Sequence, residues 1–144
     1  PEWSKKFIPT LDQVIVMSVV PGKSGQKYIE NTHEKTKNLM SSLKENNFTG
    51  YIEADGGVTL DNIGQCFADG ARAFVGGSAI IGQTDVRLVI REFRNQVLRT
   101  RRKLLIQKAN ELGGTELVNK WIDLHVLGKK KDELTQIATE LGYQ

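Results

Sequence analysis

Three short runs of β-type residues, each ending in a glycine turn, constrain most strongly what this chain can fold into. The first run, residues 13–20 (QVIVMSVV), is rich in β-branched side chains and is closed by Pro21 and Gly22, a pattern typical of a strand buried on both faces. The second run, residues 51–54, leads into the sequence DGG, and the third, residues 73–75, leads into GGS. The sequence therefore predicts three short strands with their turns at the carboxyl ends.

Helical segments lie between these strands. Residues 28–46 carry apolar side chains at helical spacing, and residues 59–70 start with a capping signal and carry a second apolar stripe. Strands that alternate with helices pair in parallel through right-handed crossovers, and parallel sheets bind ligands at the carboxyl ends of their strands. The predicted fold class is α/β.

The remainder of the chain has a different character. Residues 83–144 are almost all helix formers, and we predict helices over residues 85–112, as one helix or two, and over 115–127 and 132–141. This part carries 12 Lys and Arg against 8 Asp and Glu, whereas residues 1–82 carry 8 against 9. We predict an α/β part at 1–82 and a helical extension at 83–144, which packs on the first part or at a dimer interface.

Composition excludes several classes of protein. No apolar run approaches the roughly 20 residues that a membrane-spanning helix needs. A single cysteine, Cys66, excludes a disulfide framework and favours a reducing compartment, so a cytoplasmic location is expected. Basic clusters at residues 99–103 and 129–131 are typical of solvated helix faces, so nucleic-acid binding is not expected. The first residue is Pro1, which suggests that the gene begins upstream.

The glycine turns are the candidate binding site. Glycine lets backbone N–H groups converge on an anion, so three such turns at one edge of a sheet predict a phosphate cradle, although glycines can also simply turn the chain. Asp55 ends the second strand, where a carboxylate can act as a general acid or base or a metal ligand, or can form the turn. Of the remaining candidates, His33 and His125 are interpreted as surface or helix residues and Cys66 as a core residue.

Three segments of this sequence resemble one known family. VIVMSVVPGKSGQKYI, IEADGGV and AFVGGSAII, in this order and spacing, are similar to the C-terminal half of the ribulose-phosphate 3-epimerases and the related hexulose-phosphate 3-epimerases, and they lie within residues 13–82. That family folds as a TIM barrel. The resemblance implies that this chain holds barrel strands six to eight in βαβαβ order, followed by a helical C-terminal extension.

The resemblance also implies roles for individual residues. Asp55 would bind a divalent metal of the Zn, Fe or Mn type and serve as one of two acid/base carboxylates, and Met17 would line the pocket over an enediolate. Backbone groups of six residues would surround the phosphate: Gly22, Gly25, Gly56, Gly57, Gly77 and Ser78. The implied protein is an isomerase of the pentose phosphate pathway that interconverts D-ribulose 5-phosphate and D-xylulose 5-phosphate.

Two departures from the family pattern qualify this expectation. Lys23 and Ser24 stand where the family has an aromatic residue and a glycine, which leaves open whether the substrate is a pentose or a hexulose phosphate. The family's two metal-binding histidines, its other aspartate and its first-strand serine belong to the half of the barrel that precedes these segments. We therefore expect an incomplete metal site and no activity from this chain alone, and we expect it to act with a missing N-terminal half or as a homo-oligomer.

Other interpretations of the same residues remain. The chain is a fragment, one part of a split enzyme, or a half-barrel, and the alternative function is a non-catalytic module that binds sugar phosphate or mediates assembly. A third possibility is another phosphate-binding barrel enzyme, against which Met17 and Asp55 argue.

Overall fold

The chain folds into two compact units, Pro1–Thr100 and Arg101–Gln144. The structure, a computed structural model, describes residues 5–22, 25–111 and 114.

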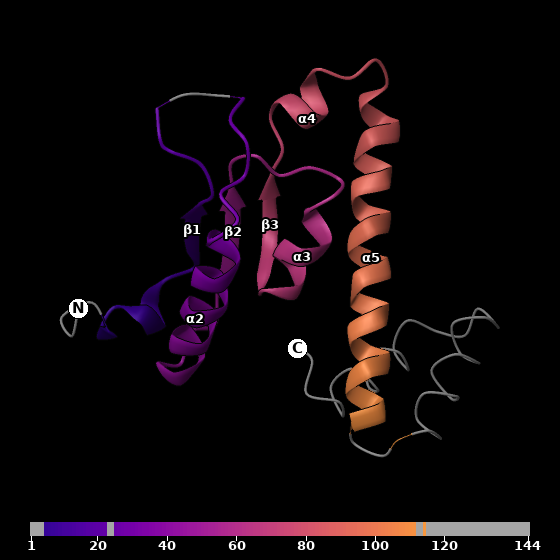
Figure 1. Cartoon of the computed structure of the whole chain (residues 1–144). Coiled ribbons are helices and arrows are strands. Elements are labelled where there is room, and N and C mark those ends of the chain that lie inside the picture. The colour runs from indigo at the N-terminus through magenta and orange to yellow at the C-terminus, as the bar shows by residue number, and fades with distance from the viewer. Residues whose placement is uncertain (1–4, 23–24, 112–113, 115–144) are drawn as a thin grey trace. The chain divides into compact units, whose positions relative to one another are not determined.

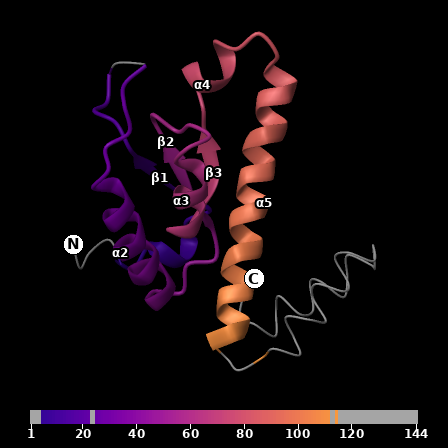
Figure 2. The same cartoon turned by 45° about the vertical axis from the view of Figure 1, so that its right-hand side comes forward.

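A parallel sheet of three strands forms the centre of the first unit. Its strands are β1 (Gln13–Met17), β2 (Tyr51–Asp55) and β3 (Ala71–Val75), in the order β1-β2-β3. The last residue of β1 pairs with the last residue of β2, and the register between β2 and β3 shifts between Ile52 and Glu53. Figures 1 and 2 show the three strands ending at the same edge, where the loop after β1 and helix α4 also lie. The α/β prediction is confirmed.

The helices that join the strands are shorter than the sequence predicts. Helix α2 (Thr32–Glu45) connects β1 to β2, and α3 (Ile63–Ala68) connects β2 to β3. The first predicted helix starts four residues late because the N–H of Ile29 donates to the carbonyl of Ser18 at 2.8 Å, which holds the preceding segment against the end of β1. Strand β1 itself ends at Met17, three residues before the predicted end of the strand.

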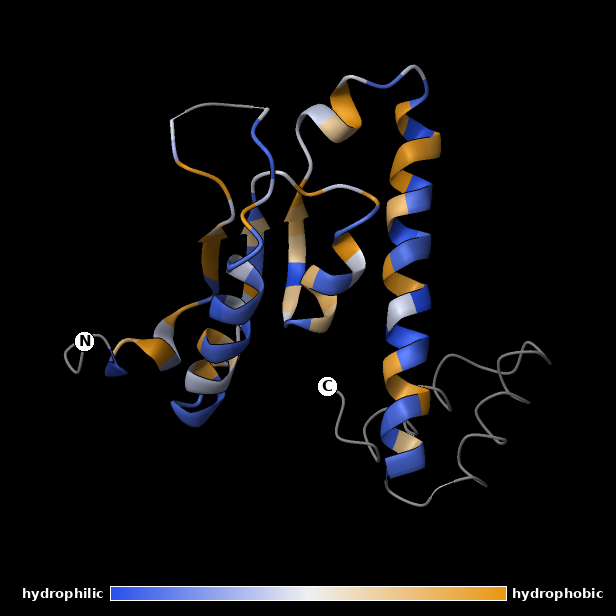
Figure 3. Ribbon diagram, viewed as in Figure 1, coloured by the Kyte–Doolittle hydropathy of each residue, from blue (hydrophilic) through white to orange (hydrophobic). Residues whose placement is uncertain are grey.

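Three further helices complete the described part of the chain. A 3-10 turn, η1 (Ile8–Thr10), precedes the sheet, the short α4 (Ser78–Ile81) follows β3, and α5 (Val86–Glu111) forms the segment for which one helix or two were predicted. Figure 3 shows hydrophobic and hydrophilic residues alternating along α5, as expected for an amphipathic helix. Among the described residues, no helix is long and apolar enough to cross a membrane.

One face of the sheet is covered and the other is open. Ile52 and Ala54 of β2 are buried, and a core of helix and strand residues packs around them. Side chains alternate along a strand, so their neighbours point to the opposite face, where Ile15 is 55% exposed and Met17 42% exposed. The buried residues of this core are Leu43, Ile52, Ala54, Val58, Ile63, Cys66, Ala71 and Phe93.

The described part of the second unit is the end of α5 together with Gly114. Leu105 and Ala109 are buried there, and the N–H of Gly114 donates to the carbonyl of Ala109 at 2.8 Å. The predicted helices over 115–127 and 132–141 lie outside the described residues, as does His125. The boundary between the two compact units falls between Thr100 and Arg101, within α5. The predicted division after Gly82 stays a prediction.

Candidate functional site

The carboxyl ends of β1 and β2 bring two of the predicted site residues together. Met17 and Asp55 are register partners, and partners in a parallel pair share one face of the sheet. Both lie on the open face, because they follow the buried Ala54 and Val16, a partly buried residue that packs against the core. Asp55 is half-buried and Met17 is exposed, so both side chains are accessible from this face.

A serine that the sequence analysis missed fixes the turn after Asp55. Ser18 is fully buried, and its N–H donates to the carbonyl of Asp55 at 2.8 Å. Its hydroxyl donates to the carbonyl of Gly56 at 2.6 Å and lies 3.0 Å from that of Asp55. Because these contacts tie the end of β1 to the turn after β2, the backbone that carries the Asp55 carboxylate has little freedom.

Two glycines in this turn cannot be replaced without strain. Gly56 has a φ of +115°, and a Cβ there would clash with the side chain of Val19. Gly57 has a φ of +65°, and a Cβ there would lie 2.5 Å from the backbone nitrogen of Tyr28. The loop after β1 and the turn after β2 therefore approach each other so closely that only glycine fits the conformation and the space at these two positions.

A cleft of about 620 Å³ gathers most of the predicted phosphate-binding residues. Gly25, Gly57, Gly77 and Ser78, from the loops after all three strands, line this cleft. The other two predicted residues, Gly22 and Gly56, do not line it. The structure thus places four of the six predicted residues around one space.

Asn62 holds the far side of the same turn. Its side-chain nitrogen donates to the carbonyl of Gly57 at 2.9 Å, and its side-chain oxygen accepts from the N–H of Thr59 at 2.8 Å. The sequence predicts a helix cap at this point, and Asn62 does occupy the N-cap position of α3, although its side chain bonds to the preceding turn and not to the helix.

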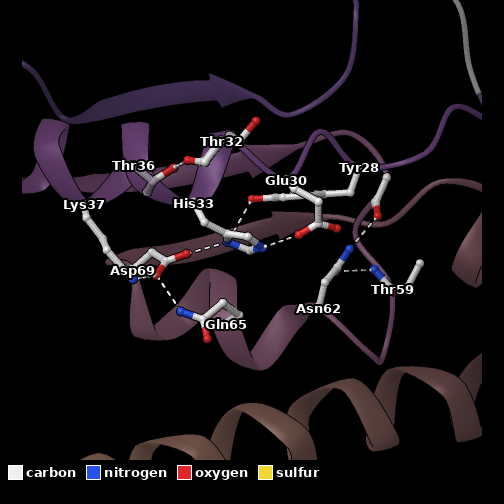
Figure 4. A network of polar contacts seen from close by, with 11 residues as sticks. Tyr28, Glu30, Thr32, His33, Thr36, Lys37, Thr59, Asn62, Gln65 and Asp69 are labelled. Carbon is white, nitrogen blue, oxygen red and sulfur yellow. Dashed lines mark hydrogen bonds and ion pairs between the residues drawn. The ribbon is translucent and has the colours of Figure 1, made fainter.

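A polar network that the sequence did not reveal borders the cleft (Figure 4). Nδ1 of His33 lies 2.5 Å from Oδ2 of Asp69, whose side chain is 1% exposed. Oδ1 of Asp69 accepts from Nε2 of Gln65 at 2.7 Å and lies 3.3 Å from Nζ of Lys37. His33 lies in helix α2, as one of the two readings of this residue predicts, but the sequence gives no sign of its contact with Asp69, because that carboxylate comes from the end of α3, which is distant in sequence.

Tyr28 and Cys66 belong to the buried side of this network. Burial, reinforced by the neighbouring Cys66, raises the pKa of the Tyr28 hydroxyl, which therefore stays protonated at neutral pH. Burial likewise raises the pKa of the Cys66 thiol, which is 2% exposed. The interpretation of Cys66 as a core residue is confirmed, since Cys66 is part of the buried core cluster.

The described residues do not by themselves form a metal site. Within 5–22, 25–111 and 114, no three His, Cys, Asp or Glu side chains lie close enough together to hold a metal ion. Catalytic zinc sites typically use about three protein ligands, and Asp55 offers one. The residues of this part of the chain alone therefore do not fit a catalytic metal.

Comparison with known proteins covers the segment that carries these residues. The family model described as "Ribulose-phosphate 3 epimerase family" matches residues 2–81, more than half of the chain. The chain belongs to this family. The strands, the glycine turns and Asp55 all lie within the matched segment, so the three-stranded sheet is part of the TIM-barrel type of fold expected for its members.

Individual relatives match the same segment. "Ribulose-phosphate 3-epimerase" of Escherichia coli strain K12 is 42% identical over 87 residues, which are 60% of this chain and 39% of the relative. The protein of the same name from Methanocaldococcus jannaschii is 34% identical over 96 residues, 67% of this chain and 41% of the relative. The chain thus spans about two fifths of the length of the relatives it matches.

Proposed function

We propose that this chain is the part of a sugar-phosphate 3-epimerase that supplies one acid/base carboxylate and the phosphate-binding turns. The observation that carries the proposal is the pairing of Met17 with Asp55 on the open face, at the same edge of the sheet as the turns with Gly57 and Ser78 that line the cleft. Met17 and Asp55 themselves do not line the cleft. The names of the relatives support a ribulose phosphate as the substrate class.

The chemistry proposed for Asp55 is proton transfer at the carbon beside a carbonyl. A carboxylate held on a rigid strand end accepts the proton from one face of the substrate, and a second acid on the opposite face returns a proton, which inverts that carbon. The Ser18 contacts position Asp55 for this step. The second carboxylate lies outside the described residues in this proposal. A divalent metal of the Zn, Fe or Mn type, which the family resemblance implies, would need ligands from outside the described residues, with Asp55 as one ligand from this chain.

The open surfaces of the sheet support completion by further barrel units. Within the described residues, β1 and β3 each have one hydrogen-bonded neighbour, which leaves one edge of each strand unpaired. The open face also exposes Ile15, Met17 and Val75 by 55%, 42% and 41%. Unpaired strand edges and exposed apolar side chains need a covering partner, and we propose that the N-terminal half of a barrel, or a second copy of this chain, supplies it.

A graft into the Escherichia coli relative tests the proposal. In this graft, the matched 87 residues of the relative are replaced by the corresponding residues of this chain. We expect the graft to interconvert D-ribulose 5-phosphate and D-xylulose 5-phosphate, and we expect Asp55→Asn to reduce kcat by at least about a hundredfold while phosphate binding persists. Asp12→Asn, the same change at an exposed site before β1, is the control and is expected to retain activity.

The alternative is a non-catalytic module that binds sugar phosphate. The observation in its favour is that the described residues contain no group of three metal-ligating side chains. A folded graft that binds phosphate but does not epimerise would favour this module. Turnover retained after Asp55→Asn would refute the role assigned to Asp55. The cytoplasmic location and the helical extension's role in packing or dimerisation stay predictions.

A further inference from the structure

A buried carboxylate fixes the orientation of an imidazole at the wall of the cleft. The Asp69 side chain is 1% exposed, and it receives contacts from His33, Gln65 and Lys37 at 2.5, 2.7 and 3.3 Å. An ionised carboxylate only accepts hydrogen bonds, so Nδ1 of His33 is the nitrogen that carries the proton and donates. Donors on both carboxylate oxygens leave this buried charge compensated and the imidazole in one orientation.

The oriented imidazole in turn supports Tyr28. The two rings stack with their centroids 4.7 Å apart and their planes 30° apart, and the Tyr28 hydroxyl oxygen lies 3.4 Å from Nδ1 of His33. On the other side of the imidazole, Nε2 lies 3.7 Å from a carboxylate oxygen of Glu30. Figure 4 shows His33 between Asp69 and Glu30, with Tyr28 beside it. The ring of Tyr28 therefore has a fixed support on its buried side.

The backbone of Tyr28 contacts the turn that borders the cleft. A Cβ on Gly57 would lie 2.5 Å from the nitrogen and 2.9 Å from the Cα of Tyr28, so the two backbones touch. One residue further, the N–H of Ile29 donates to the carbonyl of Ser18. Because of this close approach, a displacement of Tyr28 toward the turn would move Gly57, which lines the cleft together with Gly25 and Ser78.

We propose that His33 and Asp69 are positioning residues for phosphate binding, which act through the ring and backbone of Tyr28 on the turn at Gly57. The inference rests on the proposed function, because it takes the cleft to be the phosphate site. It assigns a role to two residues that belong neither to the glycine turns nor to the carboxylate that transfers the proton. The interaction joins the start of α2 to the end of α3, so it ties together two connections between strands.

Phosphate titrations of the 144-residue chain test the proposal. Backbone amide resonances are recorded by NMR while inorganic phosphate is added, first to the unaltered chain and then to Asp69→Asn. The Asn side chain keeps the size but removes the charge that orients His33. We expect Asp69→Asn to weaken phosphate binding by about fivefold or more and to shift the amide resonances of Tyr28 and Gly57 before phosphate is added.

His33→Asn provides a second variant that is designed to stay folded. The side-chain nitrogen of Asn follows the same bonds from Cα as Nδ1 of His, so it can still donate to Asp69, whereas the ring that stacks on Tyr28 is lost. We expect the same weakening of phosphate binding. Thr36→Ala is the matched control, because Thr36 is a buried residue one turn further along α2 whose hydroxyl donates to the carbonyl of Thr32. It is expected to bind phosphate within about twofold of the unaltered chain.

The outcomes separate this inference from the function on which it rests. If the unaltered chain shows no phosphate-dependent shifts at Gly25, Gly57 and Ser78, the phosphate site and the positioning role are both refuted. If the unaltered chain binds phosphate and folded His33→Asn binds it equally well, only the positioning role is refuted. Equal weakening in Thr36→Ala would also refute it, because any disturbance of α2 would then be sufficient.

Discussion

The hydroxyl oxygen of Ser18 lies 2.6 Å from the carbonyl oxygen of Gly56, although 38 positions separate the two residues in the sequence. Ser18 is fully buried, so no solvent replaces this contact if it is removed. The end of one strand thereby holds the turn that carries Asp55 on the next strand.

Removal of the Ser18 hydroxyl is expected to destabilise the chain. Ser18→Ala removes this donor from the partly buried carbonyl of Gly56, which costs about 1–3 kcal/mol in the free energy of unfolding. Urea denaturation measures the change. Ser41→Ala, which removes an exposed hydroxyl that bonds only within its own helix, is expected to change stability by less than about 0.5 kcal/mol. Equal effects of the two substitutions would contradict the role given to Ser18.

Three glycines of the candidate site form a graded test of why glycine is required. Gly77 has a negative φ, and no atom lies within 4 Å of the position that a Cβ would occupy there. Gly22 has a φ of +102° in open space, and Gly56 has both a φ of +115° and a clash with Val19. Substitution by Ala is therefore expected to cost less than about 0.5 kcal/mol at Gly77, about 1 kcal/mol at Gly22, and about 3 kcal/mol or more at Gly56.

Thermal or urea unfolding of the three variants gives the ranking directly. The order of the costs matters more than their absolute size, because each step adds one physical cause. A large loss of stability in Gly77→Ala would contradict the open space at that position. A tolerated Gly56→Ala would contradict the close approach of Val19.

The sequence predicts the parts of this fold that depend on neighbouring residues. Strand β2 and the turn at Gly56 and Gly57 are recognisable because β-type runs and glycines act locally. The contact between His33 and Asp69 cannot be recognised in the sequence, because 36 positions separate the two residues and nothing next to either of them indicates a partner. Asp69 stands before Gly70 at the end of α3, where the sequence gives no sign of burial, and only the folded structure, with His33 and Lys37 of α2 beside it, shows that it is buried.

Alkaline pH is expected to destabilise the chain through Tyr28 and Cys66. The pKa values of both groups are raised above their ordinary values of 10.0 and 9.0, so the unfolded chain loses these protons at a lower pH than the folded chain. Their stabilising contribution is therefore fully present below about pH 9 and declines as the pH rises above it, by up to about 1.4 kcal/mol per pH unit for each group.

Tyr28→Phe isolates the tyrosine's share of this dependence. Between about pH 8 and pH 11, the free energy of unfolding of this variant is expected to fall by about 1.4 kcal/mol less than that of the unaltered chain. Tyr51→Phe, at an exposed tyrosine on the open face, is the control and is expected to leave the pH dependence unchanged. Urea unfolding under reducing conditions measures both, and parallel pH profiles for Tyr28→Phe and the unaltered chain would contradict the assignment.

The first half of α5 is expected to contribute to the core of the first unit. Phe93 is 7% exposed and packs in the core cluster, near Gly76 at the end of β3, whereas Leu98 is 59% exposed. Phe93→Ala removes buried apolar volume and is expected to cost about 3–4 kcal/mol, against less than about 1 kcal/mol for Leu98→Ala. Because Phe93 lies beyond the predicted boundary at Gly82, equal and small effects in a urea unfolding experiment would favour that boundary over one within α5.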